Sequence, residues 1–580
     1  MSGSVMKTFI VCTKLKEVRH IQRRCLSLSS SSWNIRDNIL YHPRPVDIPN
    51  VSLTEYIFSK IENYADFTAF ECALTHRKLT FGEVRKASRN LSKALRKKLG
   101  LKKGDVALIY FPNCPEFPVA TLACLEAGIV ASTVNSLYTP DEISRQLKDS
   151  QAKIIITCQE VYANAEKAVA SLPGKIPIIC ARTKSDQSLP QGAIDFTELT
   201  NTIIDIPDLD PPSPDDIAIL PYSSGTTGLP KGVELSHRNI VSNLCQLSEH
   251  EVDFIEKAHG NFQEITPGVL PMFHIYGFTI TTLNVMTNGA KVLTLPRFTP
   301  ETFVNTLKEH PITLIFSAPP LVLFLTHHPE VKKEYLKSLR SIMSGAAPLG
   351  KLDEEQFLQK AGNHVYMSQG YGLTETSPVV STTSKRLRQL YKEASNGSVG
   401  NVIANTEVKI VKPDDQTGTP LGPNENGEIL VKGPQVMIGY HNNPEATKNA
   451  FLGSWLKTGD LGHYDENGLL FITDRVKELI KVRGFQVPPA ELEEILRSHP
   501  KVSDAAVIGI PHDISGEVPR AYIIPKGELK PEEIYDFVAE KVAKYKKLDG
   551  GIELVKEIPK NSAGKILRRQ LKQKYLNENQ

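Results

Sequence analysis

A run rich in glycine and hydroxyl side chains has the composition of a loop that holds a polyphosphate. It reads Tyr222-Ser-Ser-Gly-Thr-Thr-Gly-Leu-Pro-Lys-Gly232 and follows the apolar segment Ile217 to Leu220. Glycines permit backbone conformations in which successive N–H groups point inward, toward phosphate oxygens. Further donors and positive charge would come from Ser223, Ser224, Gly225, Thr226, Thr227 and Lys231. The Gly-Lys-Ser/Thr of a Walker loop is absent, and a polar turn is the alternative interpretation.

The run is nearly identical to the phosphate loop of the adenylate-forming enzymes, which the chain resembles from about residue 45 to residue 572. The resemblance is to the acyl-CoA ligases of that family, which include the 4-coumarate–CoA ligases and the beetle luciferases. It implies that a carboxylate attacks the α-phosphorus of ATP and pyrophosphate leaves. The thiol of coenzyme A then attacks the acyl-adenylate and releases AMP. The expected cosubstrates are ATP and coenzyme A, with Mg2+ as the metal.

A second motif, Gln369-Gly-Tyr-Gly-Leu-Thr-Glu-Thr376, is similar to the family's next ATP-binding segment. A carboxylate beside phosphates requires a cation between them, because two anions repel. The resemblance therefore makes Glu375 the Mg2+ contact, Thr374 a catalytic phosphate donor and Tyr371 a flat face for adenine. Gln369 and Gly370 would bind ATP beside them. By itself, Glu375 is typical of a solvated surface acid.

Two short motifs accompany this segment. Thr458-Gly-Asp-Leu-Gly462 is similar to the motif whose aspartate, here Asp460, accepts the ribose hydroxyl protons. Ser344-Gly-Ala-Ala-Pro-Leu349 matches the small-residue segment beside adenine and the acyl group. It implies acyl contacts for Gly345 and Ala346 and an ATP contact for Ala347. Without the family, both motifs are typical of capped or tight turns.

The acyl group is expected at Leu270-Pro-Met-Phe-His-Ile-Tyr-Gly277, which resembles the family's acyl-site motif. The resemblance implies that His274 and Tyr276 lie beside the carboxylate and the acyl chain. A single histidine among apolar residues is otherwise typical of a hydrogen-bonded core histidine.

The segment Asp474-Arg-Val-Lys-Glu-Leu-Ile-Lys-Val-Arg-Gly484 resembles the family's hinge. It implies that Asp474 is the hinge residue, that Arg475 contacts the ribose, and that Lys477 and Lys481 meet the adenylate. The family usually has Lys-Gly where this chain has Arg483-Gly484. Arginine keeps the charge with different geometry, so a coenzyme A contact is expected there and at Arg297, a position that is often lysine in the plant ligases.

The last motif is Ile558-Pro-Lys-Asn-Ser-Ala-Gly-Lys-Ile-Leu-Arg-Arg569. In it Lys565 falls on the family's catalytic lysine, which would enter and leave the phosphate site as the C-terminal domain rotates about Asp474. The run Asn561 to Lys565 departs slightly from the usual pattern. Without the family, Lys565 is one more solvated charge in a basic tail.

The motifs leave several functions open. A luciferase-like monooxygenase acting on an acyl-adenylate, an enzyme that loads a carrier protein, and a catalytically inactive binding protein would share this sequence pattern. The acid is also open between aryl or cinnamate-like acids and the medium- or long-chain acids of fatty acid metabolism.

The elements that must position these residues alternate between short apolar runs and longer helical patterns, which predicts an α/β fold with parallel, helix-covered sheets. Expected early elements are strands at 106–111, 153–157 and 178–180 and helices at 116–127 and 161–172. A β-subdomain is expected from strands at 407–411 and 427–432. A small, mobile α+β C-terminal domain follows, with helices at 489–497 and 531–545 and strands at 504–509 and 521–524. The predicted boundaries are 1–44 for a tail, 45–473 for the large domain and 474–580 for the small one.

Composition limits the partners and the location. A net charge of +3 on 580 residues gives no indication of nucleic acid binding, and no long uncharged apolar stretch predicts a membrane span. We expect a monomer or homodimer. Before Asp37 there are seven basic residues and one acidic residue, with serines at 27–32, which is typical of a transit peptide to the mitochondrial matrix. A disordered tail on a cytoplasmic protein is the alternative, and the C-terminus lacks the peroxisomal Ser-Lys-Leu.

Overall fold

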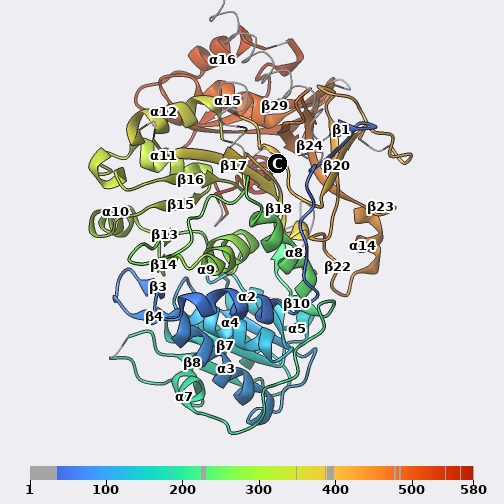
Figure 1. Cartoon of the computed structure of the whole chain (residues 1–580). Coiled ribbons are helices and arrows are strands. Elements are labelled where there is room, and N and C mark those ends of the chain that lie inside the picture. The colour runs from blue at the N-terminus through green and yellow to red at the C-terminus, as the bar shows by residue number, and fades with distance from the viewer. Residues whose placement is uncertain are drawn as a thin grey trace, which may run out of the picture.

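The computed structural model describes residues 35–578, apart from residues 185, 224–229, 348, 363, 386, 388–396, 414, 476, 477, 483, 484, 543, 562 and 563. In Figure 1 much of the C-terminal part of the chain lies at the top, most of the blue and cyan elements lie at the bottom, and an antiparallel sheet that includes the first described strand lies at the right. The mixed α/β architecture predicted from the sequence is confirmed.

A largely parallel sheet is covered by helices on both faces and leads into the phosphate run. Its strand order is β9-β8-β7-β5-β6-β10-β12-β11, with β22 beside β12. Alternate residues of the central strand face opposite sides: Ile109 packs with the helix at 116–126, and Leu108 with the helices at 140–150 and 159–170. The strands are β5 (Val106–Tyr110), β6 (Val130–Thr133), β7 (Ile154–Cys158), β8 (Ile178–Ala181), β9 (Ile194–Asp195), β10 (Ile217–Ile219), β11 (Tyr222–Ser223), β12 (Lys231–Ser236) and β22 (Gly439–Tyr440). The helices are α2 (Leu53–Ile61), α3 (Phe81–Lys97), α4 (Glu116–Glu126), α5 (Pro140–Ser150), α6 (Gln159–Ala170), α7 (Phe196–Asn201) and α8 (His237–Leu247).

Two further sheets follow, and the second of them carries the start of the second ATP motif. Their orders are β13-β14-β3-β4 and β15-β16-β17-β18-β19. The strands are β3 (Thr68–Cys72), β4 (Lys78–Thr80), β13 (Ile265–Gly268), β14 (Lys291–Thr294), β15 (Leu314–Ser317), β16 (Ser341–Ser344), β17 (Tyr366–Gly372), β18 (Val379–Thr382) and β19 (Asn401–Val402). The helices are a π-helix (Tyr276–Asn284), α9 (Val285–Thr287), α10 (Pro300–Glu309), α11 (Pro319–His327) and α12 (Lys351–Ala361). Short 3-10 turns occupy Glu62–Tyr64, Lys333–Leu336 and Thr374–Thr376.

An antiparallel sheet forms the β-subdomain and includes the first described residues. Its order is β1-β2-β20-β21-β24-β23, with β25 against β24. The elements are β1 (Ile35–Arg36), β2 (Ile39–Tyr41), β20 (Glu407–Val411), β21 (Gly427–Lys432), α14 (Pro444–Ala450), β23 (Phe451–Leu452), β24 (Trp455–Tyr464) and β25 (Leu470–Arg475). Leu40 pairs with Val408 and is fully buried. The predicted tail boundary at residue 44 is therefore too late, because a pairing with residues far along the chain orders residues 35–41.

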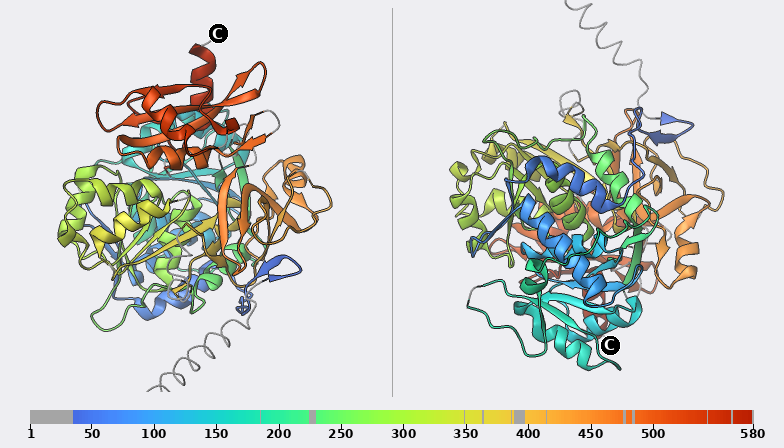
Figure 2. Two further views of the ribbon diagram at one scale, coloured as in Figure 1. Left: turned by 90° about the horizontal axis from the view of Figure 1, so that it is seen from above. Right: turned by 60° about the horizontal axis from the view of Figure 1, so that its bottom comes forward.

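The C-terminal residues form a separate layer with its own buried core, seen in red in Figure 2. Its strand order is β27-β26-β29-β28, with β30 beside β29. The elements are β26 (Ile480–Val482), β27 (Phe485–Val487), α15 (Pro489–Arg497), β28 (Val502–His512), β29 (Gly516–Pro525), α16 (Pro531–Ala539), β30 (Ile552–Leu554) and α17 (Arg568–Glu578), with a 3-10 turn at Lys544–Lys546. The helix predicted to reach Tyr545 ends at Ala539, and the chain beyond it returns to α15, where Lys546 pairs with Glu491 at 2.6 Å.

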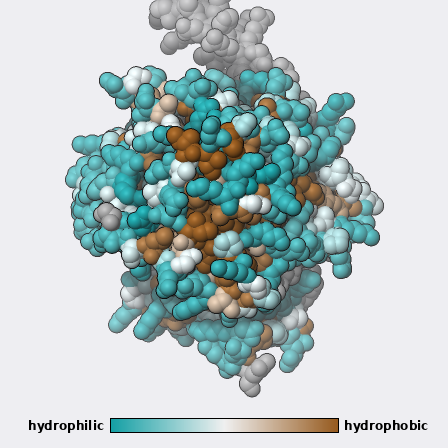
Figure 3. Space-filling model, turned by 90° about the horizontal axis from the view of Figure 1, so that it is seen from below, coloured by the Kyte–Doolittle hydropathy of each residue, from teal (hydrophilic) through white to brown (hydrophobic). Residues whose placement is uncertain are grey.

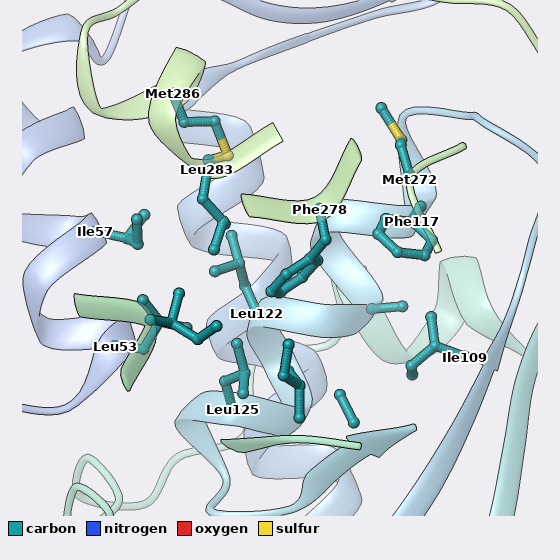
Figure 4. Packing of buried hydrophobic residues seen from close by; sticks show 14 of the residues in the cluster. Leu53, Ile57, Ile109, Phe117, Leu122, Leu125, Met272, Phe278, Leu283 and Met286 are labelled. Carbon is teal, nitrogen blue, oxygen red and sulfur yellow. The ribbon is translucent and has the colours of Figure 1, made fainter. Parts of the chain in front are cut away.

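The largest apolar cluster lies where the first sheet meets the middle sheets. Figure 4 shows Leu122 and Leu125 of α4 among Leu53 of α2 and Phe278 and Leu283 of the π-helix. All of these side chains are at most 1% exposed. Fully burying such a side chain stabilises a fold by roughly 1.5–3 kcal/mol. The π-helix that follows the acyl-site motif is therefore held firmly on the side facing this core.

Within the part of the chain that the structure describes, no helix combines the length and the apolar character needed to cross a membrane. The face seen from below in Figure 3 is mostly hydrophilic, with apolar side chains gathered across its middle.

Candidate active site

The two arms of the phosphate run form a hairpin. In the β11–β12 pair, Ser223 lies opposite Lys231, and the residues between them include Ser224, Gly225, Thr226 and Thr227, which lie outside the described residues. The Tyr222 hydroxyl donates to Asp149 Oδ2 at 2.5 Å, which anchors one arm to α5. The Lys231 ammonium lies 5.0 Å from the centre of the Tyr440 ring. The hairpin therefore presents Ser223 and Lys231 at a fixed place beside β22.

Glu375 lies against this hairpin. Its Oε1 accepts the Tyr440 hydroxyl at 2.9 Å and the Ser223 hydroxyl at 3.3 Å. Burial and the Glu375 charge raise the pKa of Tyr440, so that hydroxyl stays a donor. Both hydrogen bonds that the described residues donate to this carboxylate end on Oε1. One carboxylate oxygen beside a phosphate loop fits Mg2+, which usually binds one or two carboxylates plus phosphate oxygens and water.

We expect Glu375→Gln to raise the Mg2+ concentration for half-maximal adenylate formation by about tenfold or more. The amide still accepts from Tyr440 but loses the charge, and a charged contact contributes about 1.5–3 kcal/mol. Pyrophosphate release against Mg2+ concentration measures the shift. The control is Glu445→Gln, an exposed acid on α14, which should leave the curve unchanged. An unshifted curve for Glu375→Gln would refute the metal contact.

Three predicted nucleotide residues from separate strands meet at one carboxylate. The Tyr371 hydroxyl donates to Asp460 Oδ2 at 2.8 Å, and Arg475 Nε lies 2.9 Å from Asp460 Oδ1. Asp460 and Arg475 face each other in the β24–β25 register. Burial and the Asp460 charge raise the pKa of Tyr371 well above its ordinary value. Tyr371, predicted as a face for adenine, thus also orients the aspartate. Thr374 lies half-buried in the turn that also carries Glu375.

The small-residue segment turns sharply after β16. Ala346 has a φ of +68°, a left-handed conformation that a side chain seldom adopts and that is characteristic of functional turns. The Gln369 amide donates to Leu349 O at 3.2 Å and accepts from Leu349 N at 3.3 Å. Its side chain therefore holds the segment that carries Gly345 and Ala347. A direct contact between Gln369 and ATP stays a prediction, as does one for Gly370 on the same strand.

The two acyl-site residues lie beside that segment. The Tyr276 hydroxyl donates to the carbonyls of Ser317 and Met343, both at 3.4 Å. Burial lowers the pKa of His274 to about 4, so its ring is neutral at physiological pH. Because His274 Nδ1 accepts the N–H of Tyr276 at 3.3 Å, we assign the ring proton to Nε2, which can donate a hydrogen bond to an acyl carboxylate.

Gly345 lies close to the Tyr276 side chain. A Cβ at this position would be 3.1 Å from Tyr276 Cε1. We expect Gly345→Ala to raise the KM for the acid by about tenfold while changing that for ATP little, since a single methyl in a tight pocket is worth 10- to 200-fold. The matched control is Gly350→Ala, where the nearest atom is 3.5 Å from the new Cβ. An unchanged KM for the acid in Gly345→Ala would argue against the acyl site.

Lys565 enters this site from the C-terminal layer. Its N–H donates to Asn561 Oδ1 at 2.8 Å, and its carbonyl accepts the Asn561 N–H at 2.8 Å, which closes a tight loop. Gly564 has a φ of +80°, and a Cβ there would meet Pro320 of α11 at 2.8 Å. The loop therefore docks on the large domain. Burial and the Arg475 charge lower the pKa of Lys565 to about 8, whereas the charges of Glu478 and Asp460 raise it. The ammonium lies 3.8 Å from Glu478 Oε1.

The carboxylate of the predicted hinge residue, Asp474, accepts hydrogen bonds from both parts of the molecule. Asp474 accepts the N–H of Arg475 at 2.7 Å and the N–H of Ala490, in the first turn of α15, at 3.2 Å. Burial raises the pKa of Asp474 to about 7. The predicted hinge residue thus lies between β25 of the large domain and α15 of the C-terminal layer.

The remaining predicted contacts stay predictions. Lys481 is exposed on β26, and Arg297 is exposed after β14. Lys477, Arg483 and Gly484 lie outside the described residues, so the coenzyme A contacts stay predictions. Four residues that contact predicted site residues, directly or through one another, were not predicted from the sequence: Asp149, Tyr440, Glu478 and Arg568. Arg568 stands in the tail motif, but nothing in the sequence distinguishes it from Arg569.

Comparison with known proteins agrees with this geometry. The sequence model of the AMP-binding enzyme family matches residues 57–441, and the family model of the AMP-binding enzyme C-terminal domain matches residues 491–565. The 4-coumarate–CoA ligase 3 of Oryza sativa subsp. japonica is 38% identical over 537 residues, 91% of this chain and 93% of the relative. The 4-coumarate–CoA ligase 1 of Arabidopsis thaliana is 37% identical over 562 residues, 95% and 98% of the two chains.

Solved structures share the fold along nearly the whole chain. ATP-bound MatB from Rhodopseudomonas palustris has a TM-score of 0.79 at 26% identity, covering 92% of this chain and 100% of its own. The apo form of MatB has a TM-score of 0.69 at 26% identity. The chain therefore belongs to the AMP-binding enzyme family, as an AMP-forming acyl-CoA synthetase of the 4-coumarate–CoA ligase type.

Proposed function

We propose that this protein uses ATP and Mg2+ to convert an aryl or cinnamate-like acid into its acyl-adenylate and then transfers the acyl group to coenzyme A. One observation carries the proposal. The pKa of the tail lysine Lys565 responds to the charges of Asp460 and Arg475, that of Arg475 responds also to Glu375, and the Gly564 turn beside Lys565 packs on Pro320 of the large domain. A site that only bound phosphate would not need a lysine from the C-terminal layer to act together with these residues.

The acid class is supported by the relatives. The curated relatives cited above are named for 4-coumarate. An anthranilate CoA ligase in complex with anthranoyl-AMP has a TM-score of 0.79 at 25% identity, covering 90% of this chain and 97% of its own.

The chain's residues would divide the first step between them. Asp460 accepts the ribose hydroxyls, and Arg475 holds that carboxylate in place. His274, neutral, donates to the acyl carboxylate through Nε2. Lys565 supplies positive charge where negative charge develops as the carboxylate oxygen attacks the α-phosphorus and pyrophosphate leaves. Such chemistry needs positioning and charge more than acid–base catalysis.

Mg2+ bound at Glu375 would neutralise phosphate charge. Ser223 and Tyr440 hold the Glu375 carboxylate in place by donating hydrogen bonds to its Oε1. Lys231, on the facing arm of the hairpin, adds a second cation to the same side of the phosphates.

A panel of acids tests the proposal. Hydroxycinnamic, benzoic, medium-chain and long-chain fatty acids are each incubated with ATP, Mg2+ and coenzyme A, and AMP release is measured. The expected result is the highest kcat/KM for an aromatic acid, with AMP release dependent on coenzyme A. A preference for fatty acids would refute the assignment of an aryl or cinnamate-like acid. Accumulation of acyl-adenylate without thioester would refute coenzyme A as the acyl acceptor. Lys565→Ala is the inactive control.

A further inference from the structure

A guanidinium lies at the base of the loop that carries Lys565. Arg568, the first residue of α17, directs its side chain inward, with 15% of it exposed. Its Nη2 donates to both oxygens of Glu493 at 2.8 Å, its Nη1 contacts Glu478 Oε2, and its Nε donates to Val507 O at 3.2 Å. All three guanidinium nitrogens are thus engaged.

These partners come from separate elements. Glu493 is on α15, Val507 is on β28, and Glu478 follows the hinge. The Glu493 side chain is 4% exposed, and its Oε1 also accepts the Val507 N–H at 2.8 Å. Arg568 therefore fixes the start of α17 to the body of the C-terminal layer. An arginine is suited to this role because its planar group can serve several acceptors at once.

Glu478 is shared between two cations. Its Oε2 contacts Arg568, and its Oε1 lies 3.8 Å from the Lys565 ammonium. Its own N–H donates to Arg475 O at 3.0 Å, which joins it to the hinge strand. Two carboxylates, Glu478 and Glu493, are thus balanced by two cations, Arg568 and Lys565. Burying such charges is costly unless all are paired and well oriented.

We propose that Arg568 is a positioning residue for adenylate formation, which holds Glu478 and, through it, the Lys565 ammonium at the nucleotide site. The inference rests on the proposed function. Lys565 stands in a glycine loop, and a flexible lysine placed about 1 Å away from its working position can cost 10²-fold in rate. Thioester formation, in which Lys565 has no charge to stabilise, does not depend on this restraint.

The charges around Lys565 supply a second readout. Arg475 and Arg568 lower its pKa, whereas Glu478 and Asp460 raise it, with burial the largest effect. The ammonium is present below about pH 8 and is lost as pH rises through that value. Without the Glu478 charge the pKa of Lys565 falls further, so the alkaline limb of the adenylation rate moves to lower pH. A purely structural contact would leave this limb in place.

The test compares Arg568→Met, Glu478→Gln and the matched control Arg569→Met, which changes the exposed neighbouring arginine on α17. ATP–pyrophosphate exchange, thioester formation from supplied acyl-adenylate, and thermal unfolding are measured for each. We expect Arg568→Met to slow exchange by about 10²-fold or more and thioester formation by less than about threefold. Arg569→Met should match the wild type. Glu478→Gln should shift the alkaline limb of kcat/KM for ATP to lower pH.

Equal losses in both half-reactions for Arg568→Met, or no loss in either, would overturn the inference. If Arg568→Met fails to fold, Glu478→Gln decides, and an unmoved alkaline limb overturns it. Failure of the proposed function is a different result, because the wild type would then release no AMP with any acid of the panel.

Discussion

Replacing Lys565 by alanine abolishes ATP–pyrophosphate exchange while thioester formation from supplied acyl-adenylate continues near the wild-type rate. The charges of Asp460 and Arg475 act on the pKa of this ammonium, and we expect ATP to place its ribose and α-phosphate beside those two side chains. Removing a preorganised charge from a forming transition state typically costs 10²- to 10³-fold. The second step has no pyrophosphate to expel, so it does not need this charge. Isotope exchange and a stopped assay with synthetic acyl-adenylate measure the two steps separately.

The control for this variant is Lys572→Ala. Lys572 lies on α17, pairs with Glu517 at 2.7 Å, and its side chain is 42% exposed. Its removal lowers the charge of the same helix without touching the site, and both half-reactions should stay unchanged. Exchange at the wild-type rate in Lys565→Ala would remove the lysine from the mechanism.

The second large effect is expected from Asp460→Ala, which should weaken both half-reactions. Asp460 is 4% exposed and holds Arg475 and the Tyr371 hydroxyl. Its loss leaves the guanidinium without this partner and removes the acceptor for the ribose hydroxyls. Losing a charged acceptor costs about 1.5–3 kcal/mol for each hydrogen bond to a ribose hydroxyl, so a rise of at least about 10²-fold in the KM for ATP is expected. Because the AMP moiety stays bound in both steps, thioester formation falls as well.

Tyr371→Phe tests how much the Tyr371 hydroxyl contributes to holding Asp460, separately from the Asp460 carboxylate itself. It removes one hydrogen bond to Asp460 and leaves the aspartate and Arg475 paired, so a loss of about tenfold or less is expected. A KM for ATP within twofold of the wild type in Asp460→Ala would show that the carboxylate does not hold the ribose. Selective loss of the first step alone would assign Asp460 to the chemistry that Lys565 serves.

Local pattern was enough to predict many elements. β20 and β21 have the predicted bounds, as does α15, because their apolar periodicity and flanking turn residues lie within the segments themselves. α4 also begins at the predicted residue. Elements that depend on distant partners were less predictable: α16 stops early where Lys546 meets Glu491, and residues 35–41 are ordered by pairing with β20.

For the site, sequence alone determined which residue types could perform adenylation: the phosphate run, Glu375, Asp460 and Lys565. The mitochondrial location and the coenzyme A contacts of Arg297 and Arg483 stay predictions. Only the tertiary structure decided that Tyr371 and Arg475 share Asp460, that Tyr440 and Ser223 hold one oxygen of Glu375, and that Arg568 lies behind Lys565. Motifs report local residue types, whereas these pairings join strands and helices far apart in sequence, whose meeting depends on how the whole chain packs.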